Sequence, residues 1–405
     1  MNWIILVGVA LFFVATGSLG WRFGDNGPMN FRVTNDDYSL DIKSAGDIDL
    51  AVDGSGVTTL TDGGYLDISM TRNGKRQRIR FTGENDAIAR QFWVDGDEVP
   101  WGPEADRFVT EAMPIVLRET GLHVGERVAW LLENRGHAGL LDEIDLIRSD
   151  FAQRLYTVRY AQSTKIAPAD FGRLMKIAED HMGSDFDLRT TLIEVYDAQN
   201  PTGEPLVALL AAGRSIGSDF DARTLLETVG ERIPSVPEAA TAYLEVAATI
   251  GSDFDLRNAL LPFVTQTDLG DDLVARAIAM AGATIGSDFD LRILLSGAAT
   301  RVGPSDALAR AYTTAAGSIG SDFDHKEALM ALADGADLTP AGWQMLLESA
   351  QGIGGDFECA AVLMTVAPQL PRDDAVVAAY RTTLATIGSD FEHQRAAAAL
   401  EGASR

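Results

Sequence analysis

The sequence predicts a mainly α-helical protein made of an N-terminal membrane segment, a small antiparallel β-meander domain and an α-solenoid of helix-turn-helix repeats of about 34 residues. Three observations predict this fold. An uncharged apolar run occupies residues 3–20, apolar side chains alternate with period two between residues 31 and 94, and one short phrase then recurs eight times. These patterns place the parts of the chain at 1–22 (membrane segment), 23–30 (linker), 31–103 (β domain), 104–145 (helical adaptor) and 146–405 (repeats).

The apolar run at residues 3–20 is 18 residues long and would measure about 27 Å as a helix, close to the thickness of the hydrocarbon core of a bilayer. It therefore predicts insertion into a membrane. A retained anchor and a cleaved signal segment both remain open, because Ala15-Thr16-Gly17 has the small residues of a cleavage site while the usual basic region is absent. We expect a single-pass membrane protein with most of the chain exported, or an exported protein after cleavage.

Alternation of apolar and polar side chains predicts antiparallel strands in the β domain. Asn73-Gly74 lies between two such runs, 65–72 and 75–82, and predicts a two-residue hairpin, and Asp95-Gly96 predicts another turn. The first hairpin is locally basic from Arg72 to Arg80. This basic stretch is either a solvated strand face or a contact for anionic lipid or for the acidic repeats.

The recurring phrase has the form Ile-Gly-Ser-Asp-Phe-Asp, and its first aspartate returns at steps of 34 or 35 residues from Asp150 to Asp390. This period is typical of stacked pairs of helices. Apolar residues at helical spacing lie on both sides of the phrase, so one helix is expected to end there and the next to begin. Each repeat should bury one side chain ten residues before its aspartate and one seven residues after it: Met175, Leu209, Tyr243, Ile278, Tyr312, Leu346 and Tyr380, then Leu192, Leu226, Leu260, Leu295, Leu329, Leu363 and Ala397.

The phrase itself predicts a joint between two helices. Gly251 is expected to end one helix in a left-handed conformation, and Ser252 to cap the next helix, with Asp255 completing a capping box. The other joint residues are Gly183, Ser184, Asp187, Gly217, Ser218, Asp221, Gly286, Ser287, Asp290, Gly320, Ser321, Asp324, Gly388 and Ser389. Ion pairs between residues four apart are expected for Asp185 with Arg189, Asp219 with Arg223, Asp253 with Arg257 and Asp288 with Arg292. The alanine-rich end of the last repeat is expected to face solvent as a cap.

Charge and composition exclude several function classes. The net charge is −26, and from residue 181 onward 32 Asp and Glu stand against 14 Lys and Arg, a net of −18. Such a surface repels phosphate backbones, so no nucleic-acid partner is expected. The single cysteine, Cys359, excludes an intrachain disulfide and a multi-cysteine metal site. None of the histidines begins a His-Glu-x-x-His pattern, and caps, turns and core account for the recurring residues, so we expect neither an enzyme nor a cofactor or metal.

Four segments of the chain carry a resemblance: Asp41 to Ser44, Gly63 to Ile68, Phe92 to Pro100 and Arg118 to Gly121. Together with the Ser-Asp-aromatic helical repeats, they resemble the extracytoplasmic β domain and repeat region of uncharacterised bacterial membrane proteins. Similar regions sometimes lie behind BlaR1-like metallopeptidase modules, and the peptidase module itself is missing from this sequence. The resemblance implies an envelope protein without implying an activity. Together with the apolar run, it implies a single-pass protein of the bacterial inner membrane with most of the chain in the periplasm, or a periplasmic protein after cleavage.

Two functions are compatible with these observations. The first is a non-enzymatic, membrane-tethered protein-interaction scaffold of the bacterial envelope with an acidic solenoid surface. The second is an accessory or sensor subunit that regulates a membrane peptidase or a signalling partner, with the β domain as the detecting part. The expected partner is a basic protein. The candidate contacts are acids outside the joints: Glu238, Glu245, Asp271, Asp272, Asp373 and Asp374.

Overall fold

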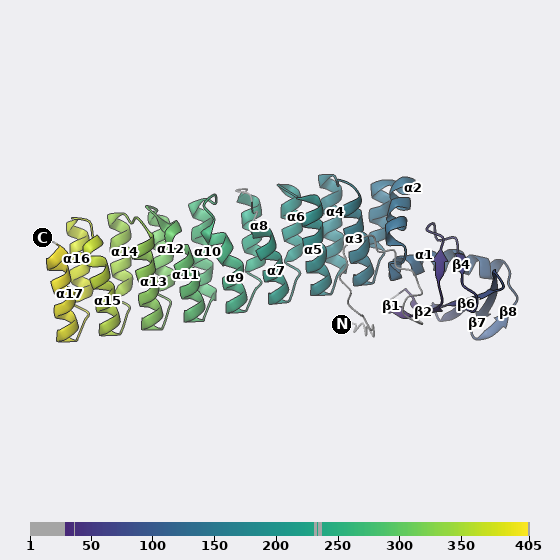
Figure 1. Ribbon diagram of the computed structural model, residues 1–405, viewed down its shortest axis with the longest axis horizontal. Helices are drawn as coiled ribbons and strands as arrows, with labels where there is room; N and C mark the ends of the chain where they lie inside the picture. The colour runs from purple at the N-terminus through teal and green to yellow at the C-terminus, as the bar shows by residue number, and fades with distance from the viewer. Residues whose placement is uncertain (1–28, 36, 231–232, 234–236, 404–405) are drawn as a thin grey trace. The chain divides into compact units, whose positions relative to one another are not determined.

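The computed structural model describes residues 29–403, except 36, 231–232 and 234–236. These residues form an N-terminal antiparallel sheet followed by a mainly helical, repeat-like array (Figure 1). The chain divides into two compact units, Met1–Asn200 and Pro201–Arg405. The expected membrane segment at residues 3–20 lies outside the described residues, and within the described ranges no helix is long and apolar enough to cross a bilayer.

The first unit contains a sheet of six antiparallel strands, which confirms the predicted antiparallel β domain. In spatial order the strands are β1 (Met29–Thr34), β2 (Ser39–Ala45), β5 (Tyr65–Arg72), β6 (Lys75–Glu84), β7 (Ala87–Val94) and β8 (Asp97–Val99). Between β2 and β5 the chain leaves this sheet to form a separate two-stranded ribbon from β3 (Ile48–Leu50) and β4 (Val57–Leu60). The ribbon therefore interrupts a simple meander.

The tight turns of the sheet use residues that tolerate a left-handed backbone. Asn73 and Gly74 have φ of 50° and 78° and join β5 to β6, with Arg72 opposite Lys75. Asp95 and Gly96, with φ of 51° and 104°, join β7 to β8 in the same way. Both predicted turns are confirmed, since asparagine, aspartate and glycine accept positive φ at little steric cost.

One face of the sheet packs on α1 (Pro103–Thr120), where Ile68, Ile79 and Phe92 meet Phe108 and Val116 in a common core. Arg78 and Arg80 of the basic hairpin alternate with buried Ile79 and lie on the opposite face, whereas Arg72 and Lys75 pair with Glu111 and Glu104 of α1. Arg78 and Arg80 both contact side chains of neighbouring strands. Arg78 donates from Nε to Asp67 Oδ1 at 2.8 Å and lies over the Trp93 ring at 4.5 Å, and Arg80 lies over the Tyr65 ring at 4.3 Å.

Four further helices complete the first unit: α2 (Val124–Asp145), α3 (Asp150–Ser163), α4 (Pro168–His181) and α5 (Asp185–Gln199). Helix α2 packs on α4, and α3 packs on α5, so the helices form two layers. A kink at Gly136, where φ is 66° and ψ is −174°, divides α2.

The second unit continues the alternation of two layers (Figure 1). One layer contains α7 (Asp219–Gly230), α9 (Asp253–Thr265), α11 (Asp288–Val302), α13 (Asp322–Gly335), α15 (Asp356–Val366) and α17 (Asp390–Ala403). The other contains α6 (Glu204–Gly213), α8 (Pro237–Ala247), α10 (Asp271–Thr284), α12 (Asp306–Ala316), α14 (Pro340–Ala350) and α16 (Asp374–Leu384). A short 3-10 turn, η1 (Ala367–Gln369), follows α15.

The hydrophobic core of the array lies between the two layers. The apolar ladder predicted from the repeat is confirmed, because its members from Met175 to Tyr380 and from Leu192 to Leu363 are at most 1% exposed. Its last member, Ala397, is half-buried. In α17 only Glu392 and Ala396 are buried, as expected for a helix whose outer face meets solvent.

Buried tyrosines form hydrogen bonds between the two layers in every second repeat of the second unit. The hydroxyls of Tyr243, Tyr312 and Tyr380 each donate to a backbone carbonyl sixteen residues later, at 2.5, 2.8 and 2.8 Å. The acceptors are Ala259, Ala328 and Ala396, each in the helix that follows the joint. A buried hydroxyl without such an acceptor would be unfavourable, so these bonds fix the depth at which each pair of helices packs.

Candidate functional site

The joints form the most regular feature of the array, and their serines act as N-caps. In each case the serine Oγ accepts a hydrogen bond from the backbone N–H three residues later, as Ser252 does from Asp255 at 3.3 Å. The same bond is made by Ser149, Ser184, Ser218, Ser287, Ser321 and Ser389, at 3.2–3.4 Å. In the α15 joint Gly355 replaces the serine and provides no side-chain cap. Each cap fixes the residue at which a helix begins.

The left-handed conformation expected for Gly251 is wrong. Neither Gly251 nor Gly183, Gly286, Gly320 or Gly388 has a positive φ. Helices α4 and α10 end in an extended residue, such as Ile285 with φ −75° and ψ 110°, whereas α12 and α16 end in a residue of right-handed helical conformation. The glycine N–H instead faces a carboxylate of the preceding joint, at 3.1 Å for Gly251 and Asp219 Oδ1. A Cβ at Gly251 would lie 3.8 Å from Asp219 Oδ2, which is ordinary contact.

The first aspartate of a joint binds the backbone of the next joint. Asp253 accepts the N–H of Gly286 at 3.1 Å through Oδ1 and the N–H of Ser287 at 2.8 Å through Oδ2. Further bonds of this kind join Asp150 to Ser184, Asp219 to Gly251 and Ser252, Asp288 to Gly320 and Ser321, Asp322 to Gly354, and Asp356 to Gly388. The first aspartate is therefore a clamp between successive repeats, beyond the helix-dipole role assigned from the sequence.

Two further predictions are wrong because the first aspartates bind the next joint: the capping box at Asp255 and the ion pairs of Arg223, Arg257 and Arg292 with the aspartate four residues earlier. The reciprocal half of the capping box is absent from the fourth joint, because Asp219 already accepts the N–H of Ser252 at 2.8 Å. The Asp255 carboxylate instead binds Arg223 of the preceding repeat, with Nε to Oδ1 at 2.8 Å. Arg257 pairs with Asp290, and not with Asp253, at 2.6 Å. Arg292 likewise pairs with Asp324 at 2.6 Å, and Arg154 with Asp187 at 2.8 Å. The arginines thus bridge repeats, because the first aspartates are occupied by backbone amides.

A glutamate outside the repeat makes the same kind of contact with the first joint. Glu119, at the end of α1, has no solvent exposure and accepts the N–H groups of Arg148 and Ser149 at 3.1 and 3.0 Å. It also accepts the hydroxyl of Tyr38 at 2.9 Å. Glu119 therefore does for the α3 joint what the aspartates do for later joints, and it links the β-sheet to that joint. The sequence analysis missed this residue, because Glu119 lies outside the periodic phrase.

Burial raises the pKa of the Glu119 carboxyl above its ordinary value of 4.5, against the lowering effect of its hydrogen bonds from Tyr38, Arg148 and Ser149. Between the unfolded value and the raised folded value, the folded state binds more protons, so the free energy of unfolding falls as pH rises through the folded pKa. The amide of Glu119→Gln does not titrate, so this variant lacks the pH dependence that the Glu119 carboxyl contributes. The stability of the wild type relative to Glu119→Gln is expected to decrease as the pH rises above the ordinary carboxyl value of 4.5, as measured by denaturant unfolding. A difference that does not change with pH would contradict this prediction.

Eight phenylalanines, one in each joint, lie exposed although they belong to the recurring phrase. Two are in the first unit, Phe151 and Phe186, at 41% and 45% exposure. The second unit has Phe220, Phe254, Phe289, Phe323, Phe357 and Phe391, at 51–67% exposure. Among the described residues, Leu146 is the remaining large hydrophobic side chain with comparable exposure. We call these eight residues the phenylalanine ladder.

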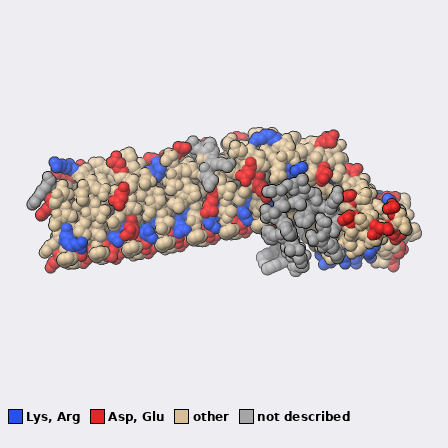
Figure 2. Space-filling model, viewed as in Figure 1, with Lys and Arg blue, Asp and Glu red and all other residues tan. Residues whose placement is uncertain are grey.

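Basic side chains stack on the ladder. Arg223 lies over the rings of both Phe220 and Phe254, at 5.1 and 5.5 Å, and so bridges two joints. Arg257, Arg292, Lys326 and Arg395 each lie over the phenylalanine of their own joint at 4.5–5.5 Å. Figure 2 shows the resulting succession of basic and acidic side chains at regular intervals along one edge of the array. The rings of Phe220, Phe254, Phe289, Phe323 and Phe391 are thus held in place and remain 51–67% exposed.

The acids predicted as partner contacts lie elsewhere. Glu238, Asp271 and Asp272 are in the first turns of α8 and α10, and Asp373 and Asp374 are at the start of α16. Because the joints lie at the other ends of these helices, roughly 16 Å separates the two edges of the array. Some of these acids already have partners: Asp271 pairs with Arg301 and Glu245 with Arg214, both at 3.3 Å, and Asp373 caps α16. Glu245 alone of the six lies near a joint.

Two further searches, for metal-binding clusters and for similar proteins, do not indicate a chemical role for these residues. Within the described ranges no group of three or more His, Cys, Asp or Glu side chains is arranged to hold a metal ion. Comparison of the chain with protein-family models, curated proteins and solved structures gives no match. The resemblance to repeat-bearing envelope proteins therefore stays a prediction.

Proposed function

We propose that the protein is a non-enzymatic interaction scaffold whose helical repeats form an α-solenoid and whose phenylalanine ladder binds an extended segment of a basic protein partner. Residues 3–20 would tether the scaffold to the bacterial inner membrane. The observation that carries the proposal is the exposure of the same aromatic side chain in every joint, where folding gains little from it. Because these side chains are 41–67% exposed, covering the exposed part of one ring would gain about 1 kcal/mol.

The spacing of the ladder favours an extended occupant. Neighbouring helices of one layer pack about 8–10 Å apart, so successive rings should recur at about that distance. A polyproline II segment advances about 9.3 Å in three residues. A partner with an apolar side chain at every third position would therefore meet one ring per repeat, and its other side chains would lie among the acids of the joints.

The charge of the second unit favours a basic occupant. Residues 201–405 contain 28 Asp and Glu against 13 Lys and Arg, a net of −15. In the sequence, each ladder residue of the second unit stands between two acidic residues of its own joint, as Phe254 does between Asp253 and Asp255. These carboxylates already bind backbone amides or an arginine of the preceding repeat. The net negative charge of the unit would therefore attract lysine or arginine beside the apolar positions of the partner, and added salt would weaken the attraction.

A second candidate function is that of an accessory or sensor subunit of a membrane peptidase or signalling partner. The bond between Tyr38 and Glu119 favours it, because this bond joins a residue of the β domain to the start of the repeats. A signal that displaced Tyr38 would remove one of the donors that hold the Glu119 carboxylate in place.

Selection from a random displayed peptide library tests the proposed function. Peptides enriched on the full-length chain are expected to combine Lys or Arg with apolar residues, and to lose binding when Phe254, Phe289, Phe323 and Phe357 are all replaced by serine. The matched control neutralises exposed acids of the opposite edge, as Glu238→Gln, Asp272→Asn and Asp374→Asn, and should retain binding. Enriched peptides that bind the serine variant as well as the wild type would contradict the proposal.

A further inference from the structure

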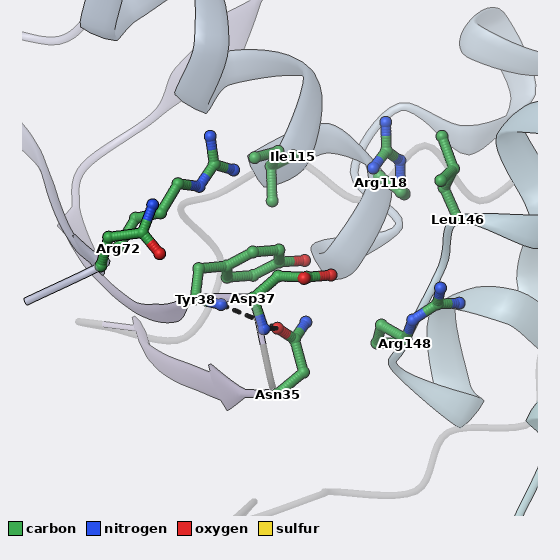
Figure 3. A pocket seen from close by; sticks show the side chains of 9 residues that line it. Asn35, Asp37, Tyr38, Arg72, Ile115, Arg118, Leu146 and Arg148 are labelled. Atoms are coloured by element: carbon green, nitrogen blue, oxygen red, sulfur yellow. Dashed lines mark hydrogen bonds between the residues drawn. The ribbon is translucent and has the colours of Figure 1, made fainter.

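A cavity of about 340 Å³ lies in the first unit, between two turns of the sheet, α1 and the α3 joint (Figure 3). In this view the Tyr38 ring lies at the centre, with Ile115 above it, Arg72 on one side and Arg118 on the other. Because a water molecule takes up about 30 Å³, a cavity of this size holds on the order of ten non-hydrogen atoms. The phenylalanine ladder contributes no residue to it.

The cavity has an excess of positive charge in a strongly acidic protein. Among the residues that the structure describes, Arg72, Arg118 and Arg148 line it together with one carboxylate, Asp37. The ion pairs of the first two arginines are weak: Arg72 Nη1 lies 3.9 Å from Glu111 Oε2, and Arg118 Nε lies 3.5 Å from Glu143 Oε1. Arg148 donates from Nη1 to the backbone carbonyls of Asp145 and Ile147, which carry no net charge.

One donor at the cavity wall, Asn35 Nδ2, makes no hydrogen bond in the described part of the chain, and Arg118 Nε has only the long 3.5 Å approach to Glu143 Oε1. Both nitrogens are shielded from solvent. The Asn35 amide is held in one orientation, because its Oδ1 accepts the N–H groups of Asp37 and Tyr38, each at 2.9 Å. Shielded donors of this kind call for a bound acceptor, and arginine forks fit carboxylate or phosphate oxygens.

The rest of the wall is apolar. Since the Tyr38 hydroxyl donates to Glu119, Tyr38 presents its ring to the cavity. Leu146, at 48% exposure, lies beside Arg118 and Arg148 in Figure 3, and Ile115 lies over the ring. An inorganic ion would leave these side chains uncovered, whereas an organic acid would cover them.

We infer that this cavity binds a small organic carboxylate, with its carboxylate group at Arg72, Arg118 and Asn35 and its apolar part against Tyr38 and Leu146. The arginines would hold the anion by charge-assisted hydrogen bonds, and the apolar wall would select against simple inorganic anions. This inference does not depend on the proposed scaffold function, because it concerns a different part of the molecule.

Titration calorimetry of the full-length chain with 4-phenylbutyrate tests the inference. Saturable binding is expected, and Arg72→Gln should weaken it about tenfold, as the loss of a charge-assisted bond would. Leu146→Ser should also weaken binding, and both side chains are exposed enough to be replaced without loss of the fold. The matched control is Arg32→Gln, which removes a surface arginine of β1 that pairs with Asp41 and does not line the cavity.

The comparison ligands are the neutral 4-phenylbutyramide and inorganic phosphate, and neither should bind as tightly as the carboxylate. Absence of saturable binding up to about 10 mM would overturn the inference. Equal binding by Arg72→Gln and the wild type would also overturn it, because the anion would then lie elsewhere. Phosphate that binds as tightly as phenylbutyrate would overturn the assignment of an organic carboxylate.

Discussion

Replacing Glu119 with alanine is expected to lower the free energy of unfolding of the first unit by about 3 kcal/mol or more. The change removes the acceptor of three donors, namely the Tyr38 hydroxyl and the N–H groups of Arg148 and Ser149. Since Glu119 has no solvent exposure, water cannot easily replace the lost carboxylate. Denaturant unfolding of the full-length chain measures the effect.

Two comparison variants separate the clamp from a general effect of lost charge. Glu126→Ala removes an exposed glutamate of α2 and should change stability little. Tyr38→Phe removes one of the three donors and leaves the other two paired, so its effect should lie between those of the other variants. A loss for Glu119→Ala no larger than that for Glu126→Ala would show that Glu119 does not hold the α3 joint.

Replacing Asp253 with alanine is expected to cost about 2–3 kcal/mol in the second unit, because it leaves the N–H groups of Gly286 and Ser287 without their charged acceptor. Asp253→Asn keeps one carbonyl oxygen and should cost less. The effect should be local in a repeat array, where each repeat contacts only its neighbours. Hydrogen exchange of the Ser287 amide should therefore accelerate more than that of amides several repeats away.

The matched control for Asp253→Ala is Asp272→Ala, which removes the same charge from the exposed first turn of α10. It should leave stability and exchange nearly unchanged. Equal destabilisation by both variants would mean that the net charge of the unit, and not the bond between joints, sets its stability.

Local signals made much of the fold predictable. The positive φ that Asn73 and Gly74 adopt at the hairpin follows from their own chemistry, and the burial of side chains such as Leu260 and Tyr312 follows from helical spacing within one repeat. Apolar alternation at Ile48 and Leu50 also predicted a strand where β3 lies, but it did not predict the pairing of β3 with β4 in a ribbon outside the main sheet. The strands of the ribbon are only three and four residues long, and such short runs carry little periodic signal.

The clamps could not be predicted locally because the partners lie about one repeat apart in the chain. Asp253 binds backbone amides 33 and 34 residues later, and Arg257 binds a carboxylate 33 residues later. The sequence analysis instead assigned each side chain a partner within its own helix. The period itself offered the missing signal, since stacking at a fixed step brings equivalent joints beside one another.

The exposure of the ladder is also a result of packing. A phenylalanine at the second position of a helix could face the core or solvent, and periodicity alone does not decide between them. The structure turns Phe254 outward, at 51% exposure, while Leu256 and Leu260 in the same helix are buried. The sequence analysis therefore placed the candidate contacts at the other edge, on acids such as Asp272 and Asp374.

The affinity of a defined extended peptide tests the central claim that the ladder is the partner-binding surface. A synthetic peptide of about six Leu-Lys-Pro units would place one apolar side chain at each ring and lysines beside the acids. It is expected to bind the full-length chain, more weakly as salt is added, and at least about tenfold more weakly when Phe254, Phe289, Phe323 and Phe357 are replaced by serine. Equal affinity for the wild type and the serine variant, or equal binding of a peptide of Leu-Glu-Pro units, would contradict the account.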